Sequence, residues 1–129
     1  MCHSAIVIDD SDIQRHFTER VLKNSSFADE VMSFDSAFDA IAFLRTAANQ
    51  PDKLPDVIFL DIHMPHMDGF DFLDAFLELP EQTREHCAIV TLSSTVASAD
   101  HLRMKNYPII RKLLSKPLSY EMLKEVSIA

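Results

Sequence analysis

The amino-acid sequence predicts an α/β fold, in which helices cover both faces of a five-stranded parallel sheet. Short apolar runs rich in β-branched residues are continuous rather than alternating, as in strands buried on both faces. Amphipathic helical patterns fall between these runs, and this alternation is typical of a parallel sheet with right-handed crossovers. The length of 129 residues and the apolar fraction of 47% suit a single domain over residues 1–129 with its own core.

Five segments are predicted to be strands. Residues 5–8, 57–60 and 88–92 are the continuous apolar runs and should form the centre of the sheet. Residues 30–34 alternate more and suit a flanking strand, whereas residues 109–114 are half polar and suit an edge. At this chain length, the topology favoured is a flavodoxin-like, doubly wound sheet with strand order 2-1-3-4-5.

The predicted helices follow these strands. Ser11 begins the first helix, and Ile13, Phe17 and Val21 recur at four-residue spacing to give it one apolar face. The other four helices are expected after Ser36, after Gly69, at residues 96–106 and at residues 119–126.

Composition and charge exclude several function classes. The net charge of −8 disfavours non-specific nucleic-acid binding. No apolar run approaches the roughly 20 residues of a membrane helix, and the N-terminus lacks a signal peptide, so we expect no membrane partner and a cytoplasmic location. In the predicted topology Cys2 and Cys87 lie roughly 9–10 Å apart, separated by a strand, which predicts no disulfide and suits a reducing compartment.

Polar residues stand at the ends of the predicted inner strands. Asp9 and Asp10 follow the first strand and Asp61 follows the third. Ser93 ends the fourth strand, and Lys116 follows the fifth. The carboxyl ends of parallel strands meet at one edge of the sheet, and ligand sites lie where the strand order reverses. We therefore expect these five side chains to converge.

The chemistry of this set points to phosphoryl transfer. Carboxylates this close raise one another's pKa or require a counterion, and a set of oxygen ligands favours Mg²⁺, which shares its shell with phosphate oxygens. A carboxylate beside Mg²⁺ can act as a nucleophile and form an aspartyl phosphate. A hydroxyl and a lysine are suited to hold the phosphoryl oxygens.

Four motifs at these strand ends carry a resemblance to a known family: Ile-Val-Ile-Asp-Asp at 6–10, Leu-Asp-Ile-His-Met-Pro-His-Met-Asp-Gly at 60–69, Leu-Ser-Ser at 92–94 and Ser-Lys-Pro at 115–117. In this order and spacing, the chain resembles the receiver domain of two-component response regulators, close in size to the stand-alone chemotaxis type, over about residues 4–127. The resemblance implies a switch that takes phosphate from a histidine kinase and catalyses its own modification, rather than an enzyme acting on other substrates.

The resemblance also implies roles for matching residues. Asp61 corresponds to the phospho-accepting aspartate. Asp10 corresponds to a direct Mg²⁺ ligand and Asp9 to a ligand acting through water, and the backbone carbonyl of His63 would complete the protein's share of the coordination. We add the hypothesis that the side chain of His63, two residues past Asp61, controls the access of hydrolytic water to the phosphoaspartate.

Ser93, Lys116 and Leu113 are the implied switch residues. Ser93 corresponds to the hydroxyl that turns inward to bind the phosphoryl group, and Lys116 to the lysine that pairs with a phosphoryl oxygen. The Lys116–Pro117 bond is expected to be cis, as is usual in this family. Leu113 departs from the pattern, because the family places Tyr or Phe there and couples burial of the ring to the motion of the hydroxyl residue.

No output domain follows residue 129 in this sequence, so we expect output through protein contacts. Candidate partners besides the kinase are a histidine phosphotransfer protein, a target protein and a second copy of the domain. Residues 101–129 carry 6 Lys and Arg against 2 Asp and Glu, whereas residues 1–100 carry 6 against 18. This surplus is either scattered and solvated or marks a partner surface on the fourth helix, fifth strand and fifth helix, at Arg103, Lys105, Arg111 and Lys112.

Three competing interpretations remain open at this point. A haloacid dehalogenase-type phosphatase would use Asp10 of Asp10-Ser11-Asp12 as its nucleophile, but no acidic pair follows Lys116 and Asp61 would have no role. A flavodoxin-like cofactor carrier is disfavoured because the acidic first loop would repel an anionic ligand. The His and Met residues at 63–67 also suit a soft-metal site.

Overall fold

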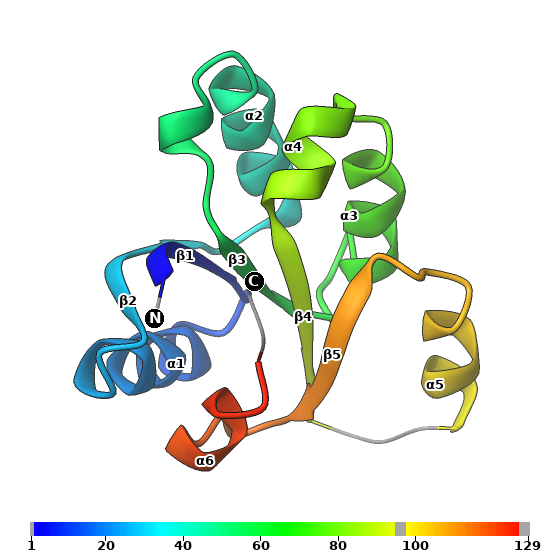
Figure 1. Ribbon diagram of the computed structural model, residues 1–129. Coiled ribbons are helices and arrows are strands. Elements are labelled where there is room, and N and C mark those ends of the chain that lie inside the picture. The colour runs from blue at the N-terminus through cyan, green and yellow to red at the C-terminus, as the bar shows by residue number, and fades with distance from the viewer. Residues whose placement is uncertain (1, 95–97, 127–129) are drawn as a thin grey trace.

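A computed structural model of the protein, which describes residues 2–94 and 98–126, contains one five-stranded sheet (Figure 1). Its strands are β1 (Cys2–Ile8), β2 (Ala28–Phe34), β3 (Val57–Asp61), β4 (Ala88–Ser93) and β5 (Ile110–Ser115). All neighbouring strands are parallel, in the order β2-β1-β3-β4-β5. The predicted fold class and strand order are therefore confirmed.

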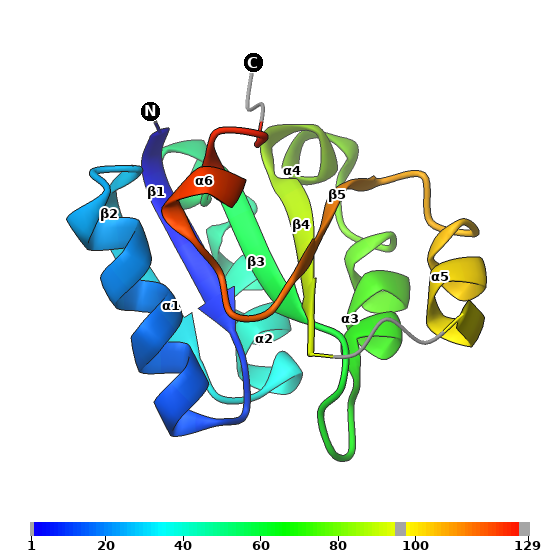
Figure 2. The ribbon, with the colours of Figure 1, turned by 90° about the horizontal axis from the view of Figure 1, so that it is seen from below.

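Helices cover both faces of the sheet. Figure 2 shows α1 (Asp12–Asn24) and α6 (Tyr120–Leu123) on one face, with α2 (Ala37–Ala47) and α3 (Gly69–Phe76) on the other. The remaining helical segments are η1 (Pro51–Lys53), α4 (Glu81–His86) and α5 (Ser98–Met104). The longest described helix, α1, has 13 residues, and none of the described helices is long and apolar enough to span a bilayer.

Alternate side chains of the central strands feed two core layers. Ile6 and Ile8 of β1 pack with α2 and α3, whereas Ala5 and Val7 pack with α1 and α6. The layer under α3 is the more aromatic, since Phe70, Phe72 and Phe76 are each at most 2% exposed. Complete burial of one such side chain contributes about 2–3 kcal/mol, so α3 is a rigid support for the loop that precedes it.

Helix α1 packs in a different orientation from the one its sequence predicts. The sheet covers Thr18 and Leu22, whereas the predicted apolar face lies outward: Ile13 is 83% exposed and Phe17 is 47% exposed. Val21 is only partly buried. The stripe is therefore accessible at Ile13 and Phe17, and of its three residues Val21 is the one that packs against the core.

The ends of the chain's helices also differ from the predicted ones. The helix predicted at 96–106 is α5 (Ser98–Met104), and residues 96–97 lie outside the described part of the chain. The helix predicted at 119–126 ends at Leu123, where α6 gives way to a turn. Helix α4 was not predicted, because the side chain of Thr83 is its only buried one and leaves almost no periodic signal.

Both cysteines are free thiols, which confirms the predicted absence of a disulfide. Burial raises the pKa of the Cys87 thiol to about 12 and that of the Cys2 thiol to about 11. Both side chains are therefore protonated at neutral pH and poor nucleophiles.

Candidate functional site

Three carboxylates meet at the carboxyl edge of the sheet. Ile8 of β1 is paired with Leu60 of β3, so the register places the next residues, Asp9 and Asp61, side by side. Each of Asp9, Asp10 and Asp61 offers one oxygen, and these oxygens lie within 4.8 Å of one another. The predicted convergence of the three carboxylates is thus present in the structure.

The first loop fixes the two neighbouring aspartates differently. The Asp9 side chain points inward, is 2% exposed and accepts a hydrogen bond from the Ser11 backbone N–H at 2.9 Å. Its carbonyl oxygen accepts a bond from Nη1 of Arg15 at 3.0 Å. Asp10 is exposed. A buried carboxylate therefore stands behind an accessible one, which leaves Asp10 open to a ligand from solvent.

Lys116 supplies the positive charge of the cluster. Its Nζ lies 2.8 Å from Oδ2 of Asp9 and 3.3 Å from Oδ1 of Asp61, and the Lys116 side chain is only 10% exposed. The Nζ atom also contacts Oε1 of Gln14 on α1. The lysine is therefore held against the proposed phospho-acceptor from two sides.

The register of β4 and β5 places the hydroxyl residue beside this lysine. Ser93 is paired with Ser115, and the Lys116 backbone N–H donates to the Ser93 carbonyl at 2.9 Å. Ser93 is 8% exposed. The Lys116–Pro117 bond is cis, as the resemblance implied.

Burial sets the protonation of Asp61. Desolvation is the largest influence and raises the pKa of this carboxyl to about 6. The Lys116 ammonium opposes this shift, whereas the charge of Asp9 adds to it. The lysine thus offsets only part of the penalty, and three carboxylates face one ammonium. An oxygen-rich set with excess negative charge fits a hard divalent cation such as Mg²⁺, held by Asp9, Asp10 and Asp61.

The loop after β3 is pinned close to the strand that carries Asp61. The Gly69 N–H donates to the Ile62 carbonyl at 2.9 Å. A Cβ at position 69 would lie 2.7 Å from Cα of Ile62, so only glycine fits there. Asp68 and Asp71 form a reciprocal capping box that starts α3. The loop is therefore anchored at its far end.

His63 of this loop contacts two parts of the protein. Its backbone N–H donates to Oδ1 of Asp61 at 3.2 Å, and its ring Nε2 lies 2.8 Å from Oδ2 of Asp100 on α5. Met64 packs in the core. The two residues thus diverge, which disfavours the soft-metal interpretation of residues 63–67. The role of the His63 carbonyl as a metal ligand stays a prediction.

A small cavity lies next to the hydroxyl residue. Its volume is about 170 Å³, and its lining includes Ser93, Thr91 and Met104 as well as Leu113. Leu113 is 43% exposed. Space therefore exists beside Ser93 at the position where Leu113 replaces the aromatic residue expected from the resemblance.

Two contacts of the site were missed in the sequence. Gln14 lies in the first turn of α1, four residues after Asp10. Helical periodicity could therefore have indicated that its side chain lies near the ends of the strands. Asp100 had no such signal, because its contact with His63 depends on where α5 packs.

Comparisons with known proteins agree with this geometry. The family model described as response regulator receiver domain matches residues 5–127. A response regulator receiver protein from Dyadobacter fermentans has 35% sequence identity, with 97% of this chain and 94% of that chain covered and a TM-score of 0.85. A two component response regulator from Cytophaga hutchinsonii, at 24% identity, has the same fold, with 95% and 92% of the chains covered and a TM-score of 0.87.

Longer proteins also contain a matching segment. A protein-glutamate methylesterase/protein-glutamine glutaminase of Oceanobacillus iheyensis is 32% identical over 74% of this chain, and the match covers 24% of that protein. A sensor histidine kinase, CheAY, of Helicobacter pylori is 26% identical over 94% of this chain and 14% of its own length. The chain thus spans about a quarter or less of these two relatives.

Proposed function

The chain belongs to the response regulator receiver family, and from this premise we propose that it is a Mg²⁺-dependent phosphorylation switch whose Asp61 accepts phosphate from a histidine kinase. The observation that best supports this proposal is the contact of Lys116 Nζ with Oδ1 of Asp61, in a cluster with Asp9 and Asp10. This arrangement places a nucleophile, a phosphoryl partner and metal ligands within one small pocket.

In the proposed reaction, a carboxylate oxygen of Asp61 attacks the phosphorus of a phosphohistidine. The new O–P bond forms as the P–N bond breaks, and the departing imidazole nitrogen keeps the electron pair and takes up a proton. Lys116 and Ser93 would hold the phosphoryl oxygens, while Asp9 and Asp10 would hold Mg²⁺. The ion, when bound, supplies positive charge to the transferred group.

We propose that the domain modifies only itself, acts in the cytoplasm and signals through protein contacts. The phosphatase interpretation would make Asp10 the covalent site and would leave the Asp61–Lys116 pair without a function. The proposed output surface remains the one formed by α5, β5 and α6, and the basic residues near it are Arg103, Lys105, Arg111 and Lys112.

The test of this proposal is the site and the metal dependence of phosphorylation. We expect acetyl phosphate with Mg²⁺ to add one phosphate to the intact protein, and excess EDTA to prevent the addition. Mass spectrometry of peptides should locate the phosphate on the segment that contains Asp61. Phosphate on the segment that contains Asp10 would contradict the proposal and favour the phosphatase.

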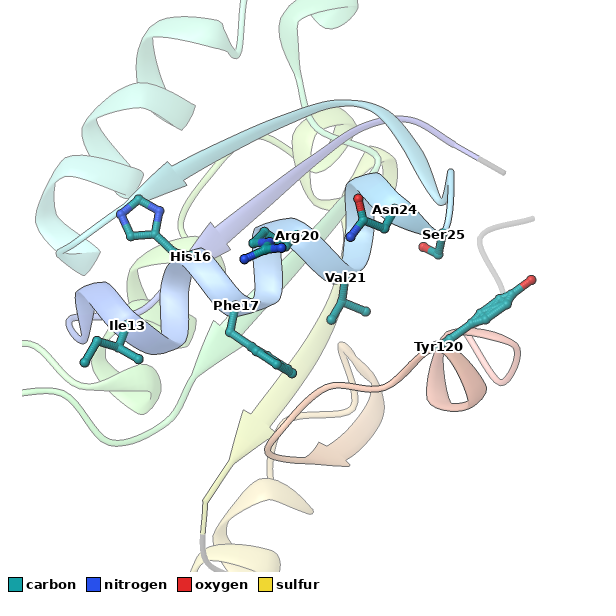
Figure 3. A pocket seen from close by; sticks show the side chains of 8 residues that line it. All are labelled: Ile13, His16, Phe17, Arg20, Val21, Asn24, Ser25 and Tyr120. Carbon is teal, nitrogen blue, oxygen red and sulfur yellow. The ribbon is translucent and has the colours of Figure 1, made fainter.

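We further propose that the kinase domain that carries the phosphohistidine docks along α1. A groove of about 890 Å³ runs along this helix, and Figure 3 shows Ile13, Phe17 and Val21 on it, with Tyr120 of α6 facing the same space. The groove starts one turn after Asp10, so a helix lying in it would end above the carboxylate cluster. His16 and Arg20 line it as well and suit a partner with acidic flanks.

Phe17→Glu is expected to slow phosphotransfer from a kinase that labels the wild type by at least about tenfold, because a charge would replace an aromatic anchor. Labelling by acetyl phosphate should stay unchanged, since this donor needs no docking surface. Leu77→Glu is the matched control, because Leu77 is 42% exposed and caps α3 on the opposite face of the sheet. Equal slowing of acetyl phosphate labelling would show that Phe17 supports the fold rather than docking.

A further inference from the structure

A side-chain bridge joins the phospho-acceptor loop to α5. His63 donates its backbone N–H to Oδ1 of Asp61, and the same residue places its ring Nε2 2.8 Å from Oδ2 of Asp100. The side chain of Asp100 is 19% exposed and that of His63 is 51% exposed. His63 thus contacts both the carboxylate of Asp61, at the end of β3, and α5, which follows β4.

The bridge lies at the N-terminal end of α5, and contacts with the core lie near the C-terminal end of the helix. There Met104 is 4% exposed, and the Arg103 guanidinium lies 4.0 Å from the centre of the Phe70 ring. Among the contacts described for the first turn, the bond from Asp100 to His63 is the one that reaches the phospho-acceptor loop. The position of this turn and the position of the His63 ring are therefore linked.

We infer that Asp100 is a positioning residue for the phosphorylation site: it holds the His63 imidazole on the side of the Asp61 pocket that faces α5. The inference rests on the proposed phosphorylation of Asp61. Held there, the ring narrows the approach of water to the phosphoaspartate from that side. A change in the position of α5 would release the ring and shorten the lifetime of the phosphoryl group.

The linkage is reciprocal. If the position of α5 alters the lifetime at Asp61, then a protein that binds α5 with the bridge intact prolongs the phosphorylated state, and phosphorylation in turn favours that bound form. Leu113 lacks the aromatic ring that usually connects the phosphorylation site to the surface in this family. The contact between His63 and Asp100 offers this chain another connection between Asp61 and the surface of α5.

A simpler explanation of the contact must be separated from this one. Asp100 lies in the first turn of α5, where any carboxylate stabilises a helix through the dipole. In that case its removal would act on α5 whether or not His63 is present. A double-mutant cycle distinguishes the two explanations, because only a bridge makes the effect of Asp100 depend on His63.

The experiment measures the loss of phosphate after labelling with acetyl phosphate and Mg²⁺ and removal of the donor. We expect His63→Ala and Asp100→Ala each to accelerate the loss by about threefold, the range of a partly exposed pair, and the double variant to be no faster than either. Glu121→Ala is the matched control, because Glu121 is also a first-turn acid of a short helix and pairs with Lys124, the residue that follows α6. It should leave the rate unchanged.

Hydrogen exchange of the unphosphorylated proteins provides an independent readout. Both single variants should increase exchange of the hydrogen-bonded amides of α5 to the same extent, with no further increase in the double variant. Two results would overturn the bridge: a double variant that loses phosphate faster than either single variant, or amide exchange in α5 that does not change in His63→Ala. Neither result would contradict phosphorylation of Asp61. Failure of the wild type to gain phosphate would instead refute the proposed function, and the exchange cycle alone would then decide whether the bridge holds α5.

Discussion

Asp61→Asn is expected to abolish the gain of phosphate from acetyl phosphate and Mg²⁺, with a loss of rate of at least about a thousandfold, as for removal of a catalytic nucleophile. The carboxamide keeps the shape of the side chain and an oxygen that can accept the His63 N–H bond. It lacks the anionic oxygen that must attack phosphorus. The measurement is the intact mass of the wild type and the variant after equal incubation.

Two further variants make this result specific. Asp10→Asn should slow labelling without moving it, because Asp61 is still present and one proposed Mg²⁺ ligand is lost. Asp35→Asn should behave as the wild type, since Asp35 is an exposed acid that lines a small cavity with Asp10 but lies outside the carboxylate cluster. A phosphate that persists in Asp61→Asn would contradict the assignment of the acceptor.

The central sheet and its acidic edge were predictable because the strand signals are local and the alternation of strands with helices favours parallel pairing. Continuous β-branched runs indicate strands buried on two faces, and parallel pairing brings the residues that follow them to one edge. Pairing of Ile8 with Leu60 then places Asp9 beside Asp61 without any further information. For this reason the identity of the cluster residues followed from the order of the strands.

The orientation of α1 was not predictable from periodicity. The stripe formed by Ile13, Phe17 and Val21 is more apolar than the face with Thr18 and Leu22, yet the second face is the one buried against the sheet. A hydrophobic stripe has the same period whether it meets the protein's own core or a partner. Only the packed structure distinguishes the two, and it places Ile13 and Phe17 of the expected core face at the surface.

The contact between His63 and Asp100 could not be predicted from the sequence, for a similar reason. The two residues are 37 positions apart and lie on a loop and a short helix whose relative placement depends on tertiary packing. The hypothesis that the His63 side chain affects the phosphoaspartate had no partner for the ring until α5 was placed. The structure shows that Asp100 is this partner, so the hypothesis can be tested by substituting both residues rather than His63 alone.

In metal-free solution at pH 7, Asp61→Asn is expected to increase the free energy of unfolding, by on the order of 3 kcal/mol. Burial raises the pKa of Asp61 to about 6, from an ordinary value of about 4. The native state therefore binds the proton more tightly than the unfolded state, and the charged carboxylate destabilises the native state at neutral pH. Asn removes that charge and leaves Lys116 paired with Asp9.

The sign of the pH dependence follows from the raised pKa. As the pH falls from 7 through 6 towards 4, Asp61 in the native wild type takes up a proton before the unfolded chain does, so its stability penalty disappears. The advantage of Asp61→Asn should accordingly be complete near pH 7 and vanish near pH 4. Urea unfolding in EDTA at several pH values measures it, with Asp35→Asn as the control that should stay within about 0.5 kcal/mol of the wild type.

Added Mg²⁺ should reverse the order of stability. The ion binds the folded carboxylate cluster and not the unfolded chain, so it stabilises the wild type by mass action and compensates the charge that Asp61 carries. The Asn variant, with one ligand fewer and less negative charge, should gain much less. A wild type that is more stable than Asp61→Asn in EDTA at pH 7, or an equal gain of both proteins from Mg²⁺, would show that these three carboxylates do not form the strained anionic site inferred from their burial.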